Sequence, residues 1–411
     1  MGVLKTLRCP KCGWDSDSKT TFRCPSCSAI LEAVLDLGSL TRSDLTDIRK
    51  RADRSLWRWF EFFPIRDRSA IVSLGEGYTP LVRSRKLSEE LDMSRLYLKN
   101  DTLLPSGSLK DRSNTIGLSK GKELGFETAA VMSTGNAAAS VAAYAAAAGL
   151  KCVALVPRGT HPSKIIQATA YGAKVAVVDG NFDHEVTDLY DAAALEFGWY
   201  DCLSSNPYRN EGKKSYAYEI FDQLDEHVPH WIIHPTAGGT GLYAMWKGWN
   251  ELHALGWAHR LPKLVAAQSE AVAPIAAAFE NGLSLIEAVE PSETVAQSIR
   301  VGNPKAMGWR ALEALRNSKG AAVALSDNEI LEPQGFLGKF AGIFAEPAAS
   351  VSLAAARKLR EKGTIGRDDL VVCNITGHGL KQPSAVPLSQ DSLEPIPPNL
   401  EALRKHLGDQ A

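Results

Sequence analysis

The stretch Trp231–Gly256, "WIIHPTAGGTGLYAMWKGWNELHALG", joins a short apolar run to a longer amphipathic segment through a glycine-rich turn. The apolar run predicts a buried strand. In the longer segment, Leu242, Trp246 and Trp249 follow one another at spacings of four and three residues, which places them on one face of a helix. The stretch therefore predicts a strand–loop–helix unit.

The same alternation of short β-rich runs and longer helical patterns continues along the chain. The runs that predict buried strands are 95–99, 128–133, 152–156, 174–178, 231–234, 264–268 and 370–375. Alternating elements of this kind predict an α/β fold with open parallel sheets covered by helices. In such sheets ligands bind beyond the carboxyl ends of the strands, so the loops after strands are the candidate sites.

Length and composition limit the classes of protein that fit. A chain of 411 residues predicts two or three domains. The net charge of -1 gives no overall field that would attract nucleic acid or anionic lipid. No run approaches the length of a membrane span and the N-terminus has no apolar signal core, so we expect no membrane partner and a cytoplasmic location.

Four of the seven cysteines form a separate motif near the N-terminus. Cys9, Cys12, Cys24 and Cys27 have the spacing C-x2-C-x11-C-x2-C, and four thiolates can close a tetrahedral zinc site. The motif predicts a zinc-ribbon-like module with structural zinc. A ribbon held by its own packing is the alternative. A zinc-ribbon protein that binds nucleic acid without catalysis is a remote alternative, because few basic and aromatic residues accompany the motif.

Four loops after predicted strands carry groups suited to chemistry. In "PTAGGTGL" (235–242), glycines let backbone N–H groups close on a phosphate at a helix N-terminus, although a tight turn is the alternative and the spacing is not that of a P-loop. In "LPSGSLKDRSN" (104–114), Lys110 is either a desolvated nucleophile or an exposed lysine. "STGNAAAS" (133–140) fits an anion site or a plain helix cap, and "NITGHGLK" (374–381) offers the hydroxyl of Thr376.

One cofactor needs all four loops, and that cofactor is pyridoxal phosphate (PLP). A lysine binds its aldehyde, a glycine-rich cup its phosphate and a polar group its ring nitrogen, while a further loop holds the substrate carboxylate. The chain resembles the threonine synthase branch of the fold-type II (tryptophan synthase β-like) PLP enzymes. The resemblance covers nearly the whole chain through "LGEGYTPL" (74–81), "PSGSLKDR" (105–112), "STGNAAASVAAYAA" (133–146), "NPYRNEGKKS" (206–215), "TVAQSIRVGNP" (294–304), "EPAAS" (346–350) and "TGHGLK" (376–381).

The resemblance implies an architecture and an assembly. It implies two open, mostly parallel α/β domains with an N-terminal zinc-ribbon-like module, and a homodimer. We expect the module at 1–36, a large PLP-binding domain at 37–122 and 205–411, and a small domain at 123–204.

The resemblance also implies an activity and a set of site residues. Lys110 would form the internal aldimine and move protons at Cα and Cβ, so that O-phospho-L-homoserine and water become L-threonine and phosphate by γ-elimination and β-hydration. The cofactor would be held by Asn136 at its 3′-oxygen, by Ala237, Gly238, Gly239 and Thr240 at its phosphate, and by Thr376 at its ring nitrogen. The implied substrate contacts are Ser133, Thr134, Gly135 and Asn136 for the carboxylate, and Ser204 and Arg209 for the phosphate.

Three departures from the family pattern leave the substrate open. Ala137 and Leu203 stand where the family often has a threonine and an asparagine, which removes two donors to the substrate phosphate. The loop "TAGGTG" is also closer to the cysteine synthase form. A β-replacement enzyme resembling cysteate synthase and acting on O-phosphoserine, or a β-eliminating serine/threonine dehydratase, is therefore the alternative.

Overall fold

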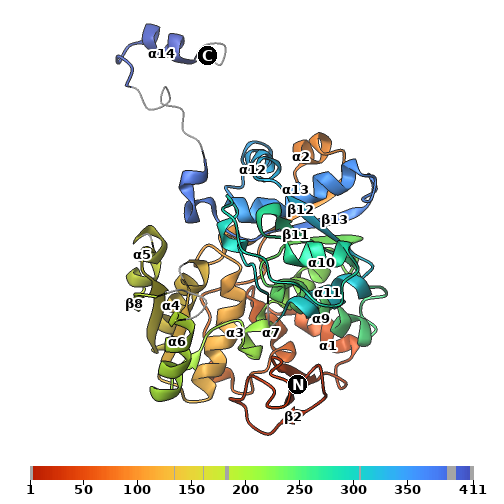
Figure 1. Ribbon diagram of the computed structural model, residues 1–411. Coiled ribbons are helices and arrows are strands. Elements are labelled where there is room, and N and C mark those ends of the chain that lie inside the picture. The colour runs from red at the N-terminus through yellow and green to blue at the C-terminus, as the bar shows by residue number, and fades with distance from the viewer. Residues whose placement is uncertain are drawn as a thin grey trace.

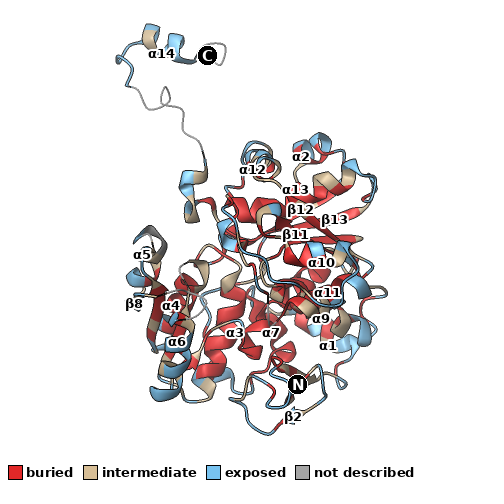
Figure 2. Ribbon diagram, in the orientation of Figure 1, coloured by how far each residue is buried: buried red, intermediate tan, exposed pale blue. Residues whose placement is uncertain are grey.

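The computed structural model describes residues 3–133, 135–160, 162–180, 185–304, 307–386 and 395–407. Within these ranges the strands form three sheets, and helices cover them (Figure 1). Buried residues concentrate in the sheets and the helices between them, and exposed residues lie around the outside (Figure 2). The predicted α/β class with mostly parallel sheets is confirmed.

The largest sheet has six strands, and every neighbouring pair is parallel except β4 with β5. In spatial order they are β12 (Ala321–Leu325), β11 (Lys263–Ser269), β10 (Trp231–Pro235), β13 (Leu370–Ile375), β5 (Arg95–Asn100) and β4 (Leu81–Val82). The strands predicted at 95–99, 231–234, 264–268 and 370–375 are confirmed. β12 and β4 lie outside the predicted strands.

Two hydrophobic cores occupy the two faces of this sheet. Ile232 of β10 joins one core and Ile233 the other, because successive side chains of a strand point to opposite faces. The helices in the first core include α8 (Ser215–Gln223), α9 (Thr240–Ala254), α10 (Pro274–Glu280) and α11 (Gly308–Asn317). Those in the second are α2 (Arg85–Glu90), α12 (Asp327–Ala341) and α13 (Pro347–Glu361).

The second sheet has four parallel strands, and the strands predicted at 128–133, 152–156 and 174–178 are confirmed in it. Their order is β8 (Lys174–Val178), β7 (Lys151–Pro157), β6 (Thr128–Met132) and β9 (Tyr200–Asp201). The helices beside them are α4 (Asn136–Ala148), α5 (Pro162–Ala170) and α6 (Glu185–Glu196). These elements fall within the expected small domain, and the domain boundaries themselves stay a prediction.

Helix α3 (Lys110–Glu123) is enclosed by the rest of the chain. It packs against α4 of the second sheet and against the short helix α7 (Pro207–Gly212). Every residue from Asp111 to Gly121 is buried, although many of them are polar. The lysine that begins this helix is therefore fixed to one of the most enclosed elements of the fold.

The N-terminal residues form a three-stranded antiparallel sheet of β2 (Asp15–Ser16), β1 (Val3–Arg8) and β3 (Glu32–Asp36). The ring of Phe22 contacts Tyr200 of β9 and Tyr208 of α7 edge-on, with ring centres 6.2 and 6.0 Å apart. Arg310 of α11 donates a hydrogen bond of 2.6 Å to the carbonyl of Ile30. The N-terminal module thus contacts β9 of the four-stranded sheet and α11, a helix that packs beside the six-stranded sheet.

The connector after the module is partly helical. It contains α1 (Arg42–Lys50) and the 3-10 helix η1 (Leu56–Phe62). The residues of η1 are all buried. The described C-terminal helix α14 (Leu400–Leu407) lies away from the rest of the chain (Figure 1). Within the described ranges, no helix has both the length and the apolar character needed to span a membrane.

Candidate active site

A deep cavity with an empty volume of about 510 Å³ lies beyond the carboxyl ends of β10, β13 and β5. Strand β10 contributes His234 and Pro235, the loop after β13 contributes Thr376, and the segment after β5 contributes Lys110. This is the edge at which open parallel sheets bind ligands. Three of the four loops singled out in the sequence meet here, and the fourth reaches the cavity through Asn136.

Lys110 lies at the wall of this cavity with no hydrogen bond or ion pair to any described residue. The backbone holds it there, because Leu109 N–H donates to the carbonyl of Thr376 at 2.9 Å. Burial lowers the pKa of Lys110, and the positive charge of Arg209 adds to this effect, while Glu346 opposes it. The interpretation of Lys110 as a surface lysine is therefore wrong.

A buried network of charges fixes the helix that Lys110 begins. Arg112 donates hydrogen bonds to Asp101 at 2.8 Å and to Glu219 at 2.6 Å, and Lys99 pairs with Glu219 at 2.6 Å. All four side chains are completely buried. Burial alone would raise the pKa of Glu219, but the two cations outweigh it and lower the pKa to about 2.

The glycine-rich loop before α9 forms another wall of the deep cavity. The backbone N–H groups of Ala237, Gly238, Gly239 and Thr240 have no acceptor among the described residues. Gly239 has a φ of +89°, and a Cβ there would lie 2.6 Å from Ala311 Cβ, so the sharp turn requires glycine. Free N–H groups at the N-terminus of a 15-residue helix favour a bound anion.

Asn136 and Thr376 flank Lys110 in the same cavity. The Asn136 amide nitrogen lies 3.2 Å from both carboxylate oxygens of Glu346, which also accepts from Ser298 at 3.0 Å. The same nitrogen also lies 3.3 Å from the Ser298 Oγ. The hydroxyl of Thr376 has no hydrogen bond to the described part of the chain, although the residue is buried.

A second, outer cavity of about 990 Å³ adjoins the deep one, and Lys110, Asn136 and Ser298 line both. Its other lining residues include Ser133, Gly135 and Ala137 at the start of α4, and Gln167 and Lys381. Lys381 donates a hydrogen bond to Gln167, and burial lowers the pKa of Lys381. The outer cavity therefore offers a helix N-terminus and a cation beside Lys110.

Sequence comparison assigns the family. The profile described as "Pyridoxal-phosphate dependent enzyme" matches residues 72–377, which include every loop that lines the two cavities except the end of the last. The chain belongs to this family. The PLP enzyme predicted from the four loops is thereby confirmed.

Relatives and solved structures of PLP enzymes agree with this assignment. A threonine synthase of Methanocaldococcus jannaschii is 41% identical over 390 residues, which cover 95% of each chain. A threonine synthase of Methanosarcina acetivorans is 37% identical over 407 residues, or 98% of this chain and 99% of the relative. Maize serine racemase superposes with a TM-score of 0.64 at 19% identity, over 81% of this chain and 93% of that chain. The likeness confirms the predicted fold-type II architecture.

The deep cavity of this PLP enzyme has groups that fit the cofactor. PLP carries an aldehyde, a phosphate and a ring nitrogen. The amine of Lys110, the free N–H groups of residues 237–240 and the hydroxyl of Thr376 match these groups in kind, and none has a partner among the described residues. The predicted cofactor-binding residues thus lie around one cavity, and their individual roles are proposals.

The predicted substrate-binding residues are less closely grouped. Ser133, Gly135 and Asn136 line the outer cavity, whereas Thr134 lies outside the described residues. Ser204 is exposed in a turn, and the Arg209 Nε donates to Asn114 at 2.8 Å. Ser204 and Arg209 line neither cavity.

Sequence reasoning missed several residues that line the cavities. They are Gln167, Lys213, His234, Ser298, Glu346 and Lys381. Lys213, Ser298, Glu346 and Lys381 lie inside the seven family motifs, which was the signal that could have found them. His234 ends a predicted strand, and Gln167 had no signal in the sequence.

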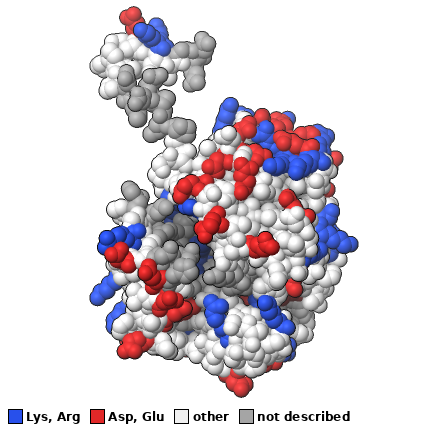
Figure 3. Space-filling view, viewed as in Figure 1, with Lys and Arg blue, Asp and Glu red and all other residues white. Residues whose placement is uncertain are grey.

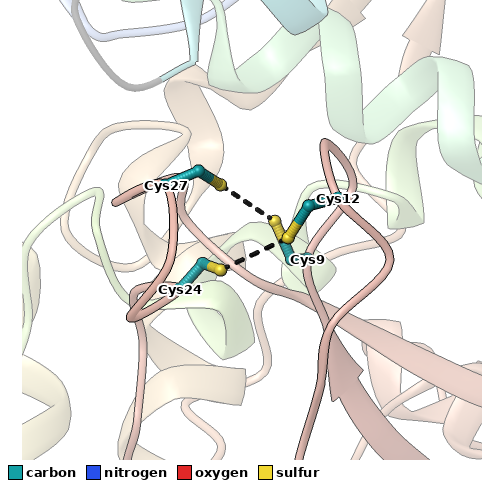
Figure 4. A group of neighbouring side chains, drawn as sticks. All are labelled: Cys9, Cys12, Cys24 and Cys27. Carbon is teal, nitrogen blue, oxygen red and sulfur yellow. Dashed lines mark hydrogen bonds between the residues drawn. The ribbon is translucent and has the colours of Figure 1, made fainter.

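The four cysteines of the N-terminal module lie together (Figure 4). All four Sγ atoms are within 4.8 Å of one another, with Cys9 to Cys27 at 3.4 Å and Cys12 to Cys24 at 3.6 Å. Four sulfurs bonded to one zinc at about 2.3 Å would lie about 3.8 Å apart, so the cluster has the dimensions of a tetrahedral site. The geometry is compatible with the predicted zinc-ribbon-like module.

Proposed function

We propose that this protein is a PLP-dependent threonine synthase, a lyase that converts O-phospho-L-homoserine and water to L-threonine and phosphate. The observation that carries the proposal is 41% identity with the Methanocaldococcus jannaschii threonine synthase over 95% of each chain. The placement of Lys110 between two adjoining cavities supports it, since one can hold the cofactor and the other the substrate.

The residues of the deep cavity would hold the cofactor. Lys110 would bind it covalently, the N–H groups from Ala237 to Thr240 would hold its phosphate, and Asn136 and Thr376 would contact its ring substituent and ring nitrogen. When bound, PLP supplies an electron-withdrawing ring that stabilises negative charge on the substrate carbons. The hydroxyl of Thr376 need not keep the ring nitrogen protonated, which favours elimination and replacement over transamination.

Lys110 is the group that can move protons in this site. Its lowered pKa leaves more of the amine free at neutral pH, as a general base requires. Lys110 takes protons from substrate Cα and Cβ, phosphate leaves from Cγ, and Cγ regains a proton. Water then adds its oxygen at Cβ, and Cα is reprotonated.

The outer cavity would hold the two anionic ends of the substrate. The start of α4, with Ser133, Gly135 and Asn136, offers donors for the carboxylate. Lys381 is the described cation that lines this cavity beside Lys110, so we assign it to the substrate phosphate. Contacts from Ser204 and Arg209 stay predictions from the sequence.

We also propose a structural zinc on Cys9, Cys12, Cys24 and Cys27, on the strength of their close sulfur positions. Homodimer formation and a cytoplasmic location stay predictions. On the face seen in Figure 3, acidic and basic side chains are interspersed, which gives no support to the nucleic-acid-binding alternative.

The test of the function is turnover of O-phospho-L-homoserine. We expect equal release of phosphate and L-threonine by the purified protein, and loss of both in Lys110→Ala, with circular dichroism to verify that the variant is folded. Turnover of O-phosphoserine without threonine formation from O-phospho-L-homoserine would instead assign the β-replacement or β-elimination alternative that Ala137 and Leu203 keep open.

A further inference from the structure

Lys213, which follows α7, is a buried lysine that lines the deep cavity and has no partner among the described residues. Its exposed fraction is only 9%, and its ammonium makes no hydrogen bond or ion pair with any described residue. The adjacent Lys214 differs, because it pairs with Glu211 at 2.7 Å and with Glu251 at 2.8 Å. A charged lysine without a partner is costly to bury, and an anion bound in the cavity would remove that cost.

Among the described residues that line the deep cavity, no carboxylate is left without a hydrogen-bond partner. Burial lowers the pKa of Lys213 well below its usual value, and the nearby charges of Lys110 and Arg209 lower it further. His234 also lines the cavity, and burial with the charges of Lys213 and Lys110 lowers its pKa to about 3, so the ring is neutral. Glu346, the carboxylate of this cavity, already accepts from Asn136 and Ser298.

The other wall of the same cavity is also built for an anion. It consists of the free N–H groups from Ala237 to Thr240 at the N-terminus of α9. A cation and a helix N-terminus that share one cavity both favour a doubly charged phosphate ester over a neutral ligand. The two observations are independent, because one concerns a side chain just after α7 and the other the backbone before α9.

We propose that Lys213 is a phosphate-binding residue of this chain, which neutralises the 5′-phosphate of PLP on the Ala237–Thr240 loop. The proposal rests on the cofactor assigned above and adds a charged ligand to the neutral loop. The substrate phosphate is the other phosphate ester available, but Lys213 lines the deep cavity and not the outer one.

The test compares PLP with pyridoxal, which has the same ring and aldehyde without the phosphate. The full-length protein is freed of cofactor with hydroxylamine, and both affinities are measured by equilibrium dialysis or by quenching of its nine tryptophans. Lys213→Met should weaken PLP binding about 10- to 100-fold, the range for one charged hydrogen bond, and leave pyridoxal binding unchanged. Lys213→Arg should restore most of the difference, and inorganic phosphate should compete with PLP less well in Lys213→Met than in the wild type.

Lys381→Met is the matched control, because Lys381 is a half-buried lysine that lines the outer cavity instead of the deep one. It should not change the ratio of the two affinities. An equal loss of PLP and pyridoxal affinity in Lys213→Met would overturn the proposal, as would unchanged PLP affinity with a raised KM for O-phospho-L-homoserine. If Lys213→Met does not fold, Lys213→Gln gives the same comparison. Threonine formation is measured separately. If Lys213→Met changes the ratio of the two affinities but the wild type forms no threonine, only the proposed function is refuted.

Discussion

Replacement of Arg112 by methionine should destabilise the protein strongly, because it leaves two buried carboxylates with one cation. Arg112 contacts both Asp101 and Glu219, and only Lys99 would remain to balance them. The pKa of Glu219, lowered from 4.5 to about 2, corresponds to about 3 kcal/mol of preference for the charged form. Breaking a buried ion pair by removing one partner typically costs about 3–5 kcal/mol.

Thermal unfolding provides the measurement for Arg112→Met. For a chain of this length, about 3–5 kcal/mol corresponds to a decrease in Tm of about 4–6 °C at pH 8. The decrease should shrink towards pH 5.5. An unpaired buried carboxylate has a higher pKa in the folded than in the unfolded protein. Its cost to the free energy of unfolding is therefore full above the folded pKa, and it disappears as the pH falls towards the unfolded pKa, because the group is then protonated in the fold.

Arg357→Met is the control for this prediction. Arg357 also pairs with two carboxylates, Glu332 at 2.6 Å and Glu361 at 2.9 Å, but all three side chains are at least one-third exposed. Its loss should lower the free energy of unfolding by less than about 1 kcal/mol. A Tm decrease in Arg112→Met that is no larger than in Arg357→Met, or that does not depend on pH, would refute the reasoning.

Three further outcomes follow from the structure. Elemental analysis should find one zinc per chain, and Cys24→Ser should lower both the zinc content and the Tm; full occupancy in the variant would exclude the site. Gly212→Ala should destabilise by about 1–3 kcal/mol, since its Cβ would lie 1.7 Å from a backbone oxygen. Gly335→Ala, at an exposed position of α12, should stabilise by about 0.5–1 kcal/mol, and denaturant unfolding compares the two variants. Lys381→Met should raise the KM of O-phospho-L-homoserine about tenfold, and this increase should exceed that in Arg209→Met. A larger increase of KM in Arg209→Met would place the substrate phosphate at Arg209.

The strands could be predicted because each is marked by a local sequence pattern. The catalytic lysine could be predicted because several loops at strand ends point to the same cofactor. Each of the seven predicted strands is a short apolar run between turn residues, and the lysine gained meaning from three other loops at strand ends. β12 was missed because "AAVAL" is rich in alanine and lacks the β-branched and aromatic residues that mark strands. The buried network of Arg112, Asp101 and Glu219 could not be predicted, since hydropathy places charged residues at the surface. The pair of Arg112 and Glu219 also spans more than 100 residues of sequence.

The placement of the residues in and after α7 shows a different limit of prediction from sequence. Arg209 and Lys213 are four residues apart in one motif, yet only Lys213 lines the deep cavity. Their positions depend on how the short helix α7 packs against α3, where Arg209 lies close to Gly117. That packing is a long-range contact and has no periodic pattern in the sequence.

The burial of every residue from Asp111 to Gly121 in α3 has a consequence for how this segment tolerates substitution. In an amphipathic helix, permissive positions recur every three or four residues on the outward face. The segment from Asp111 to Gly121 has no outward face, so a saturation library should show no such period. Ser113 and Thr115 should resist replacement as strongly as Ile116 does. The segment that carries Lys110 is thus expected to accept the fewest changes, even though its composition is that of a surface helix.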